Sequence, residues 1–275
     1  GKLGVKKIRF TGGEPLVRKD IMHFFSSVSQ LKQQYGFEFG LTTNGTLLED
    51  KLDNLKSFGL DKLNISLDSL RPERFKYITG KDNLESVIRS IRKASEIGFE
   101  PLKINVVVMR FVNDDEIIDF VDLVKDSKMN VRFIEFMPFG NNRWNRDGFI
   151  SYKEMKNIVE AKYKLTEETS FKNLVAKDFN IEGHSGKVSF ISSISSHFCE
   201  SCNRLRIDAR GKMKLCLFST GEDELSFKEL LNNKDYSDDD ICGLIETSLQ
   251  LKKKIHPEVD ELLKFEENNM LSIGG

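Results

Sequence analysis

Five extended, largely apolar segments recur along the first half of the chain, and helical patterns lie between them. The segments are Val5–Phe10, Phe37–Thr43, Lys62–Asp68, Leu102–Met109 and Val131–Met137. Each is short enough to be a strand, and the intervals between them leave room for a helix. Alternation of strands and helices at this spacing predicts a parallel sheet built from βαβ units.

Two of the intervening helices have clear signals. Apolar residues from Leu84 to Ala94 trace one helix face, and Gly98 provides a stop. Asn113 followed by Glu116 has the spacing of a capping box, and apolar residues follow at helical intervals. We therefore expect a second helix that begins at Asn113.

The predicted strands differ from ordinary parallel strands, which are buried on both faces and almost continuously apolar. Alternate residues of a strand face opposite sides, and here one parity is polar or charged on four successive strands. The polar parity contains Arg9 and Thr11, Thr42 and Asn44, Asn64, Ser66 and Asp68, and Lys103 and Asn105. A curved sheet whose interior is lined for a ligand explains this pattern better than an open, doubly covered sheet. The predicted fold class is α/β.

The pattern changes after Pro138, and we place a boundary between Phe139 and Ser151. The predicted division is a partial barrel over residues 1–145 and a C-terminal α+β region over residues 146–275. Helix signals in the second region lie at Ser151 with Glu154, at Ser226 with Glu229, and over residues 238–254. The remaining elements expected there are a mixed stretch of low order over residues 166–184, a strand at Lys187–Ile194 and a hairpin turning near Arg210–Gly211.

Charge and composition exclude several classes of protein. The chain has 275 residues, with 42 Lys and Arg against 43 Asp and Glu, which gives a formal net charge of −1. Such a balance argues against a protein held on nucleic acid or an anionic membrane by bulk charge. No apolar run reaches the length of a membrane-spanning helix, and neither a signal peptide nor a transit peptide pattern is present. Because the first residue is Gly1, we expect a chain that is cut at its start.

Three of the four cysteines lie close together in the sequence. Cys199, Cys202 and Cys216 have the pattern C-x2-C-x13-C, whereas Cys242 stands apart. This clustering favours a metal site over a disulfide. The spacing fits either an iron–sulfur cluster with one iron left open or a zinc ion, with His197 or His184 as a fourth ligand of the zinc.

Two further groups of residues suggest ligand binding. Thr11-Gly12-Gly13-Glu14-Pro15 follows a strand directly, where adjacent glycines let a ligand approach the backbone and Glu14 could take an ammonium group. A plain tight turn is the alternative.

Four cations are predicted to point into the interior, and a polyphosphate would neutralise them. They are Arg9, Lys103, Arg204 and Arg206. Salt bridges to Asp68, Glu135 or Asp208, or simple exposure to solvent, are the alternative. Met137 by itself reads as a core residue, and we expect His23 and His256 on the surface.

The ordered set of motifs resembles the GTP 3′,8-cyclase family, radical S-adenosylmethionine (SAM) enzymes that open molybdenum cofactor biosynthesis. The motifs are Lys7-Ile-Arg9-Phe-Thr-Gly-Gly-Glu-Pro-Leu-Val-Arg18, Leu41-Thr-Thr-Asn-Gly45, Asn64-Ile-Ser-Leu-Asp68, Lys103-Ile-Asn-Val-Val107, Arg132-Phe-Ile-Glu-Phe-Met-Pro138 and Phe198-Cys-Glu-Ser-Cys-Asn-Arg-Leu-Arg206, with Gly274-Gly275 at the end. The likeness spans the whole chain and implies an incomplete (β/α)6-type radical SAM barrel.

The resemblance implies roles for individual residues. SAM-binding positions are Gly12, Gly13, Glu14, Ser66 and Met137. GTP-binding positions are Arg9, Thr42, Lys103, Arg204, Leu205 and Arg206. Ligands of an auxiliary [4Fe–4S] cluster are Cys199, Cys202 and Cys216, and the tail residues Gly274 and Gly275 reach into the active site.

The resemblance also implies a reaction. A first cluster cleaves SAM reductively, the deoxyadenosyl radical removes the ribose 3′ hydrogen, and the carbon radical attacks C8 of a guanine bound to the open iron of the auxiliary cluster. The product is (8S)-3′,8-cyclo-7,8-dihydroguanosine 5′-triphosphate. Implied partners are GTP, a second copy of the chain, an electron donor and cyclic pyranopterin monophosphate synthase. The expected compartment is the cytoplasm, or the mitochondrial matrix for a eukaryotic protein.

The sequence departs from the family pattern at its start. The family's first cluster uses a C-x3-C-x2-C loop, and this sequence contains none. We therefore expect a fragment that lacks the first βα unit, the first [4Fe–4S] cluster and, alone, the full activity. A radical SAM peptide-modifying enzyme is one alternative, and a zinc-stabilised binding module without catalysis is another.

Overall fold

A computed structural model describes residues 1–139, 142–168, 175–196, 199–219, 225–253 and 255–264. Within these ranges an eight-stranded sheet dominates, with the order β1-β2-β3-β4-β5-β8-β7-β6. Six strands run parallel: β1 Lys7–Phe10, β2 Glu38–Thr43, β3 Lys62–Ser66, β4 Leu102–Val108, β5 Asn130–Glu135 and β8 Lys187–Ile191. Two antiparallel strands extend the far edge: β7 Lys177–Ile181 and β6 Leu165–Glu167.

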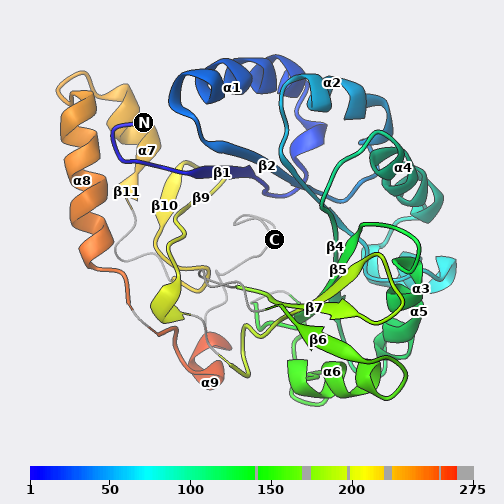
Figure 1. The fold of residues 1–275 in the computed structure, drawn as a ribbon. Helices are drawn as coiled ribbons and strands as arrows, with labels where there is room; N and C mark the ends of the chain where they lie inside the picture. The colour runs from blue at the N-terminus through cyan, green and yellow to red at the C-terminus, as the bar shows by residue number, and fades with distance from the viewer. Residues whose placement is uncertain (140–141, 169–174, 197–198, 220–224, 254, 265–275) are drawn as a thin grey trace.

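The sheet bends into an arc with helices along its outer side (Figure 1). The helices are α1 Ile21–Tyr35, α2 Leu52–Ser57, α3 Pro72–Thr79, α4 Leu84–Glu96, α5 Ile117–Leu123 and α6 Tyr152–Glu160, with short 3-10 turns η1 Pro15–Val17, η2 Glu49–Lys51 and η3 Asp114–Glu116. On each strand the alternate apolar residues face these helices. Phe39, Leu63 and Val106 are examples, and all three belong to the main hydrophobic core. Burial of this one face drives the sheet and its helices together. The α/β fold with a partial parallel barrel is therefore as predicted.

The C-terminal part crosses the open side of the arc (Figure 1). It contains η4 Cys199–Ser201, a small sheet of β9 Arg206–Ile207, β10 Lys212–Lys214 and β11 Leu225–Ser226, and helices α7 Phe227–Asn232, α8 Asp238–Gln250 and α9 Val259–Leu262. Asp208 accepts hydrogen bonds from the backbone of Arg210 and Lys212, which closes the expected hairpin turn. The division of the chain at residue 145 stays a prediction. The strands β6, β7 and β8 lie after this residue in the sequence, and they complete the main sheet.

The capping box expected at Asn113 is wrong. The Asn113 side chain accepts from the backbone of Met109 and donates to the carbonyls of Asp68 and Val107 instead. Glu116 is fully buried and accepts from Ser69, Leu70 and Arg74. Both side chains therefore serve tertiary contacts, and the chain enters α5 through η3. The helix starts expected at Ser151 and at Ser226 are confirmed: Ser151 and Glu154 form a capping box for α6, and Ser226 caps α7.

Two other expectations need correction. The stretch over residues 166–184 was expected to have low order. In the structure it includes β7 and most of β6, because the side chains of Phe179 and Ile181 are buried in the core. The last long helix ends at Gln250 rather than near residue 254. No helix in the described parts of the chain has both the length and the apolar character needed to cross a bilayer.

Replacing Gly186 with alanine is expected to destabilise the fold by about 1–3 kcal/mol through overpacking. A Cβ at Gly186 would lie 2.5 Å from the carbonyl oxygen of Val124 and 2.7 Å from that of Met129, and neither backbone group can swing aside. Gly243, inside α8, is the matched control, because nothing lies within 4 Å of the position that a Cβ would take there. Gly243→Ala should stabilise by roughly 0.5–1 kcal/mol through helix propensity. Urea unfolding of both variants measures the difference, and equal midpoints would contradict it.

Candidate functional site

The polar parity of the strands lies on the concave side of the arc, and the strand register sets its side chains in rows. One row contains Thr42, Asn64 and Lys103, and the next contains Ser66, Asn105 and Arg132. These residues come from β2, β3, β4 and β5, so the rows run across the inner face of the sheet. The inner face is therefore a polar surface with cations at defined positions.

Arg9 is the cation contributed by β1. Its guanidinium lies 3.4 Å from both the carbonyl oxygen of Leu41 and the hydroxyl of Thr42 on the neighbouring strand. Burial lowers the pKa of Arg9, the charge of Glu38 opposes this shift, and the charge of Arg204 adds to it. Arg204 is far from Arg9 in the sequence, yet its charge acts on Arg9. The first strand and the C-terminal region therefore face the same interior.

Lys103 and Arg132 face this interior from β4 and β5. Burial lowers the pKa of Lys103 to about 8, with the positive charge of Arg132 as the next cause. Burial likewise lowers the pKa of Arg132 to about 10, and the charges of Arg9 and Arg204 lower it further, while Asp178 opposes them. Several positive charges therefore lie close together in a region that is partly shielded from water.

Arg132 is a site residue that sequence reasoning missed, although its motif was recognised. Its Nε atom is buried without a hydrogen-bond partner in the structure. Such an atom is expected where a bound ligand would accept the hydrogen bond. Strand alternation could have identified Arg132, because it lies two residues after Asn130 on the fifth strand and its side chain therefore faces the same inner side.

Arg204 and Arg206 bring the C-terminal hairpin to the interior, and their apolar neighbours point away. Leu205 and Ile207 are exposed, as the alternation predicts. Burial lowers the pKa of Arg206 to about 10, the charge of Arg204 lowers it further, and the thiols of Cys202 and Cys216 oppose the shift. Arg206 therefore lies near Arg204 and near two of the three clustered cysteines. We call Arg9, Lys103, Arg132, Arg204 and Arg206 the cationic interior.

The three carboxylates expected as alternative partners of these cations make other contacts, while Glu38 and Asp178 act on the cations through their charge. Asp68 accepts from the backbone of Val107 at 2.8 Å, and burial raises its pKa to about 6. Glu135 accepts backbone hydrogen bonds from the start of α6 and from the segment after β8. Asp208 pairs with Arg210, whose Nε lies 3.2 Å from its Oδ2. The alternative of internal salt bridges to these three groups is therefore wrong.

The glycine motif lies at the carboxyl edge of the sheet. Gly12 has a φ of +126°, which side-chain-bearing residues rarely adopt, and nothing lies within 4 Å of the position of an added Cβ. The Glu14 carboxylate accepts from the Thr43 hydroxyl and the Asn44 amide, each at 2.7 Å, and from Leu16. Glu14 thus fixes the loop against β2 and leaves the Gly12 backbone open to a ligand.

Ser66 and Met137 lie at this same carboxyl edge. Ser66 is the last residue of β3, and Met137 follows β5, where it is buried with Phe139 and Phe218. In a parallel sheet the carboxyl ends of the strands meet at one edge, which is where α/β folds bind ligands. The structure thus brings the predicted SAM positions to one edge, while their ligand role stays a prediction.

The three clustered cysteines lie beside the cationic interior on η4 and after β10. Burial raises the pKa of Cys199; the His256 backbone amide and Lys252 oppose this, while Cys216 and Cys202 raise it further. Burial also opposes ionisation of Cys202, but hydrogen bonds from the backbone and side chain of Arg204 outweigh it and lower the pKa of this thiol. The thiols are therefore close enough to sense one another's charge.

The sequence predicts either a cluster or a single metal ion at the clustered cysteines. Among the described residues, no three Cys, His, Asp or Glu side chains lie together closely enough to hold a single metal ion. Cys199, Cys202 and Cys216 are free and partly buried, and thiolates are the ligands that a four-iron cluster takes, so the cluster on these residues stays a prediction.

Several expected residues lie elsewhere or outside the described ranges. His184 is not beside the cysteines, because its ring packs edge-on against Tyr163 with a centroid distance of 4.8 Å. His256 is buried rather than on the surface, and it contacts the carbonyl of Ser193. His197, Gly274 and Gly275 lie outside the described residues.

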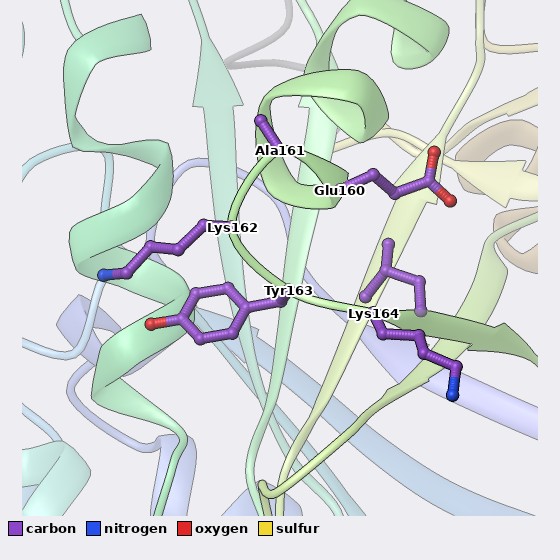
Figure 2. Close-up of a pocket in the computed structure, with 6 residues that line it drawn as sticks. Glu160, Ala161, Lys162, Tyr163 and Lys164 are labelled. Carbon is purple, nitrogen blue, oxygen red and sulfur yellow. The ribbon is translucent and has the colours of Figure 1, made fainter.

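A separate hollow of about 350 Å³ lies at the end of α6 (Figure 2). It is lined by Glu160–Leu165, most of which are exposed. The hydroxyl of Tyr163 and the ammonium of Lys162 both donate to Asp122, so these side chains are already engaged. This hollow holds none of the residues of the cationic interior.

Comparison with known proteins gives two matching families. Residues 1–124 match the Radical SAM superfamily, and residues 129–258 match Molybdenum Cofactor Synthesis C. The structure of SuiB from Streptococcus suis bound to S-adenosylmethionine is similar in fold, with a TM-score of 0.53 at 12% identity over 83% of this chain and 55% of that one.

Curated relatives agree over nearly the whole chain. The chain is 44% identical to the mitochondrial GTP 3′,8-cyclase of Arabidopsis thaliana over 99% of its own length and 69% of the relative. It is 41% identical to GTP 3′,8-cyclase of Syntrophomonas wolfei over 100% of its length and 83% of the relative. It spans 42% of molybdenum cofactor biosynthesis protein 1 of Mus musculus, at 42% identity. The chain therefore belongs to the GTP 3′,8-cyclase family of the radical SAM superfamily.

Proposed function

We propose that this chain takes part in the cyclisation of GTP by radical SAM chemistry, the first step of molybdenum cofactor biosynthesis. The observation that carries the proposal is the cationic interior, where cations from β1, β4, β5 and the C-terminal hairpin lower one another's pKa. Cations that are crowded and partly dehydrated need an anionic ligand. Asp68, Glu135 and Asp208 do not meet this need, and the triphosphate of GTP would.

The cationic interior suits a triphosphate in particular. Four of its five members are arginines, whose planar guanidinium binds phosphate oxygens in a bidentate manner. The hydroxyl of Thr42, beside Arg9, adds a neutral donor on the same face. Lys103 and Arg132 lie on adjacent strands in neighbouring rows, so they can contact different phosphates of one chain. Leu205 would contribute through its backbone, since its side chain is exposed.

The carboxyl edge of the sheet would hold SAM. Gly12 offers open backbone beside Gly13, Ser66 offers a hydroxyl, and Met137 follows the fifth strand. Reductive cleavage of bound SAM supplies the radical for this chemistry. The residues of this edge would hold the cofactor, and the cations of the interior would hold the nucleotide.

Cys199, Cys202 and Cys216 would hold the auxiliary [4Fe–4S] cluster. Three thiolates leave one iron of such a cluster available to another ligand, here the guanine base. Arg206 lies near both the thiols of Cys202 and Cys216 and the guanidinium of Arg204, so the base and the triphosphate would bind on neighbouring parts of one site. The homodimer, the electron donor, the next enzyme and the cellular compartment stay predictions.

Calorimetry with the anaerobically reconstituted chain tests this proposal. GTP is expected to bind at least roughly 100-fold more tightly than guanosine, because the cations recognise the phosphates. Equal affinity for GTP and guanosine would overturn the assignment. A chain that binds stoichiometric zinc, and no GTP, would support the alternative of a zinc-stabilised binding module. Cluster formation without preference for GTP would support a peptide-modifying enzyme.

The affinity for GTP is expected to fall as the pH rises above 8, and Lys103 is the cause. Its pKa is about 8 in the empty chain, and a bound triphosphate raises it. Lys103 therefore binds a proton together with GTP at high pH, and the affinity falls by up to about tenfold per pH unit until the bound-state pKa is reached. Calorimetry from pH 7 upward measures this slope.

Lys103→Met is the reference for that experiment, because the nucleotide itself also titrates. The variant should bind GTP more weakly at pH 7 and lack the lysine-dependent part of the slope. Parallel pH profiles for the two chains would show that Lys103 does not contact the triphosphate.

A further inference from the structure

Lys252, two residues beyond the end of α8, joins the two segments that carry the clustered cysteines. Its ammonium donates to the carbonyl oxygen of Arg204 at 2.9 Å and also to that of Leu215. Arg204 lies two residues after Cys202, and Leu215 directly precedes Cys216. One half-buried side chain therefore fixes the distance between two thiols that are not adjacent in sequence.

His256 makes a second connection to the same region. It is buried, with Nε2 3.1 Å from the carbonyl oxygen of Ser193 and with its ring against Phe218 at a centroid distance of 5.0 Å. Its backbone amide hydrogen-bonds to the thiol of Cys199. The chain after α8 is therefore attached both to the segment that leaves β8 and to the first cysteine.

Lys252 also affects the cysteines through its charge. The two carbonyls that accept from the ammonium belong to the segments that follow Cys202 and precede Cys216, so the positive charge lies beside this part of the cysteine site. No carboxylate pairs with it among the ion pairs of the described residues, and the two carbonyls that accept from it are neutral. Among the described residues, no salt bridge therefore cancels its positive charge.

We propose that Lys252 and His256 are positioning residues for the cluster site, with Lys252 also stabilising the negative charge of the bound cluster. This inference rests on the proposed function. Lys252 ties the Cys202 segment to the Cys216 segment, and His256 ties Cys199 to the sheet. A cation beside a cluster favours its reduced form, because reduction adds negative charge.

Variants of Lys252 test the proposal, with the neighbouring exposed Lys253→Met as matched control. After anaerobic reconstitution, iron loss to a chelator and the midpoint potential from an EPR-monitored titration are measured. Lys252→Met is expected to lose iron roughly tenfold faster than the parent chain and to have a more negative potential. Lys253→Met is expected to match the parent in both.

Two further variants keep the test informative if Lys252→Met folds poorly, as judged by circular dichroism. Lys252→Gln keeps an N–H donor for the carbonyls but removes the charge, so the potential should still become more negative. Lys252→Arg keeps the charge and the donors, and should restore a potential close to that of the parent. His256→Ala should lose iron faster than the parent while Lys252 is intact.

The outcomes separate this inference from the proposed function. A parent chain that takes up no iron overturns both. A parent chain with about four irons, together with Lys252→Met and Lys252→Gln variants that match it in iron loss and potential, overturns the inference alone.

Discussion

Arg206→Ala is expected to weaken GTP binding by roughly 30- to 1,000-fold, which corresponds to about 2–4 kcal/mol. Arg206 is largely buried, and its neighbours Arg204, Cys202 and Cys216 all act on its charge. Hydrogen bonds from a buried guanidinium to phosphate are strong, because little water competes for them. Calorimetric titration of GTP into the reconstituted variant measures the loss.

The same substitution should have the opposite effect on the empty chain. Burial and the charge of Arg204 both disfavour the Arg206 cation, so its removal relieves repulsion. The melting temperature without GTP should therefore stay equal or rise while affinity collapses. A variant that loses both stability and affinity would indicate a damaged fold instead.

Arg210→Ala is the matched control on the same hairpin. Its side chain is 64% exposed and pairs with Asp208 at the turn, outside the cationic interior. Its removal should change the affinity for GTP by less than about threefold. Unchanged affinity in Arg206→Ala, or equal losses in both variants, would show that the triphosphate does not bind at Arg206.

Cys216→Ser is expected to reduce the iron content from about four per reconstituted chain to less than about one. Serine is a poor ligand for iron in such clusters, and the two remaining thiols lie on one short segment around η4. Two ligands from one segment cannot enclose a cluster that needs a third from the β10 side. Iron and sulfide analysis, with the visible spectrum, measures the loss.

Cys242→Ser provides the control for this experiment. Cys242 is a free, partly buried cysteine like the others, but it lies on α8, where its charge acts on Lys2. Its replacement should leave about four irons per chain. Similar losses in both serine variants would mean that iron binds to exposed thiols without a defined site.

The fold could be predicted from the sequence because its signal is local. All five strands expected in the first half are present, since the apolar parity of each packs under a helix. The alternate polar residues of these strands correctly indicated an inner face with polar side chains. The failures occurred where side chains make distant contacts: Asn113 and Glu116 have the spacing of a helix cap, but bind the ends of β3 and β4 instead.

The candidate site could be predicted only in part. Arg9, Lys103, Arg204 and Arg206 follow from strand parity, and the same rule would have found Arg132. His256 and Lys252 had no signal, because their partners Ser193 and Arg204 lie about 50 residues or more away in sequence. Side chains that act by bridging distant segments become visible only when the chain is folded.

The crowding of cations in the interior has a consequence for how long the protein survives in a cell. Repulsion among buried positive charges lowers the stability of the empty chain, and a bound polyanion converts that repulsion into attraction. A ligand that binds only the folded state stabilises it by about 2.7 kcal/mol at 100 times its dissociation constant. Proteases act on the opened chain, so degradation should slow when the nucleotide is abundant. Supply of the substrate would in this way set the abundance of the protein that consumes it.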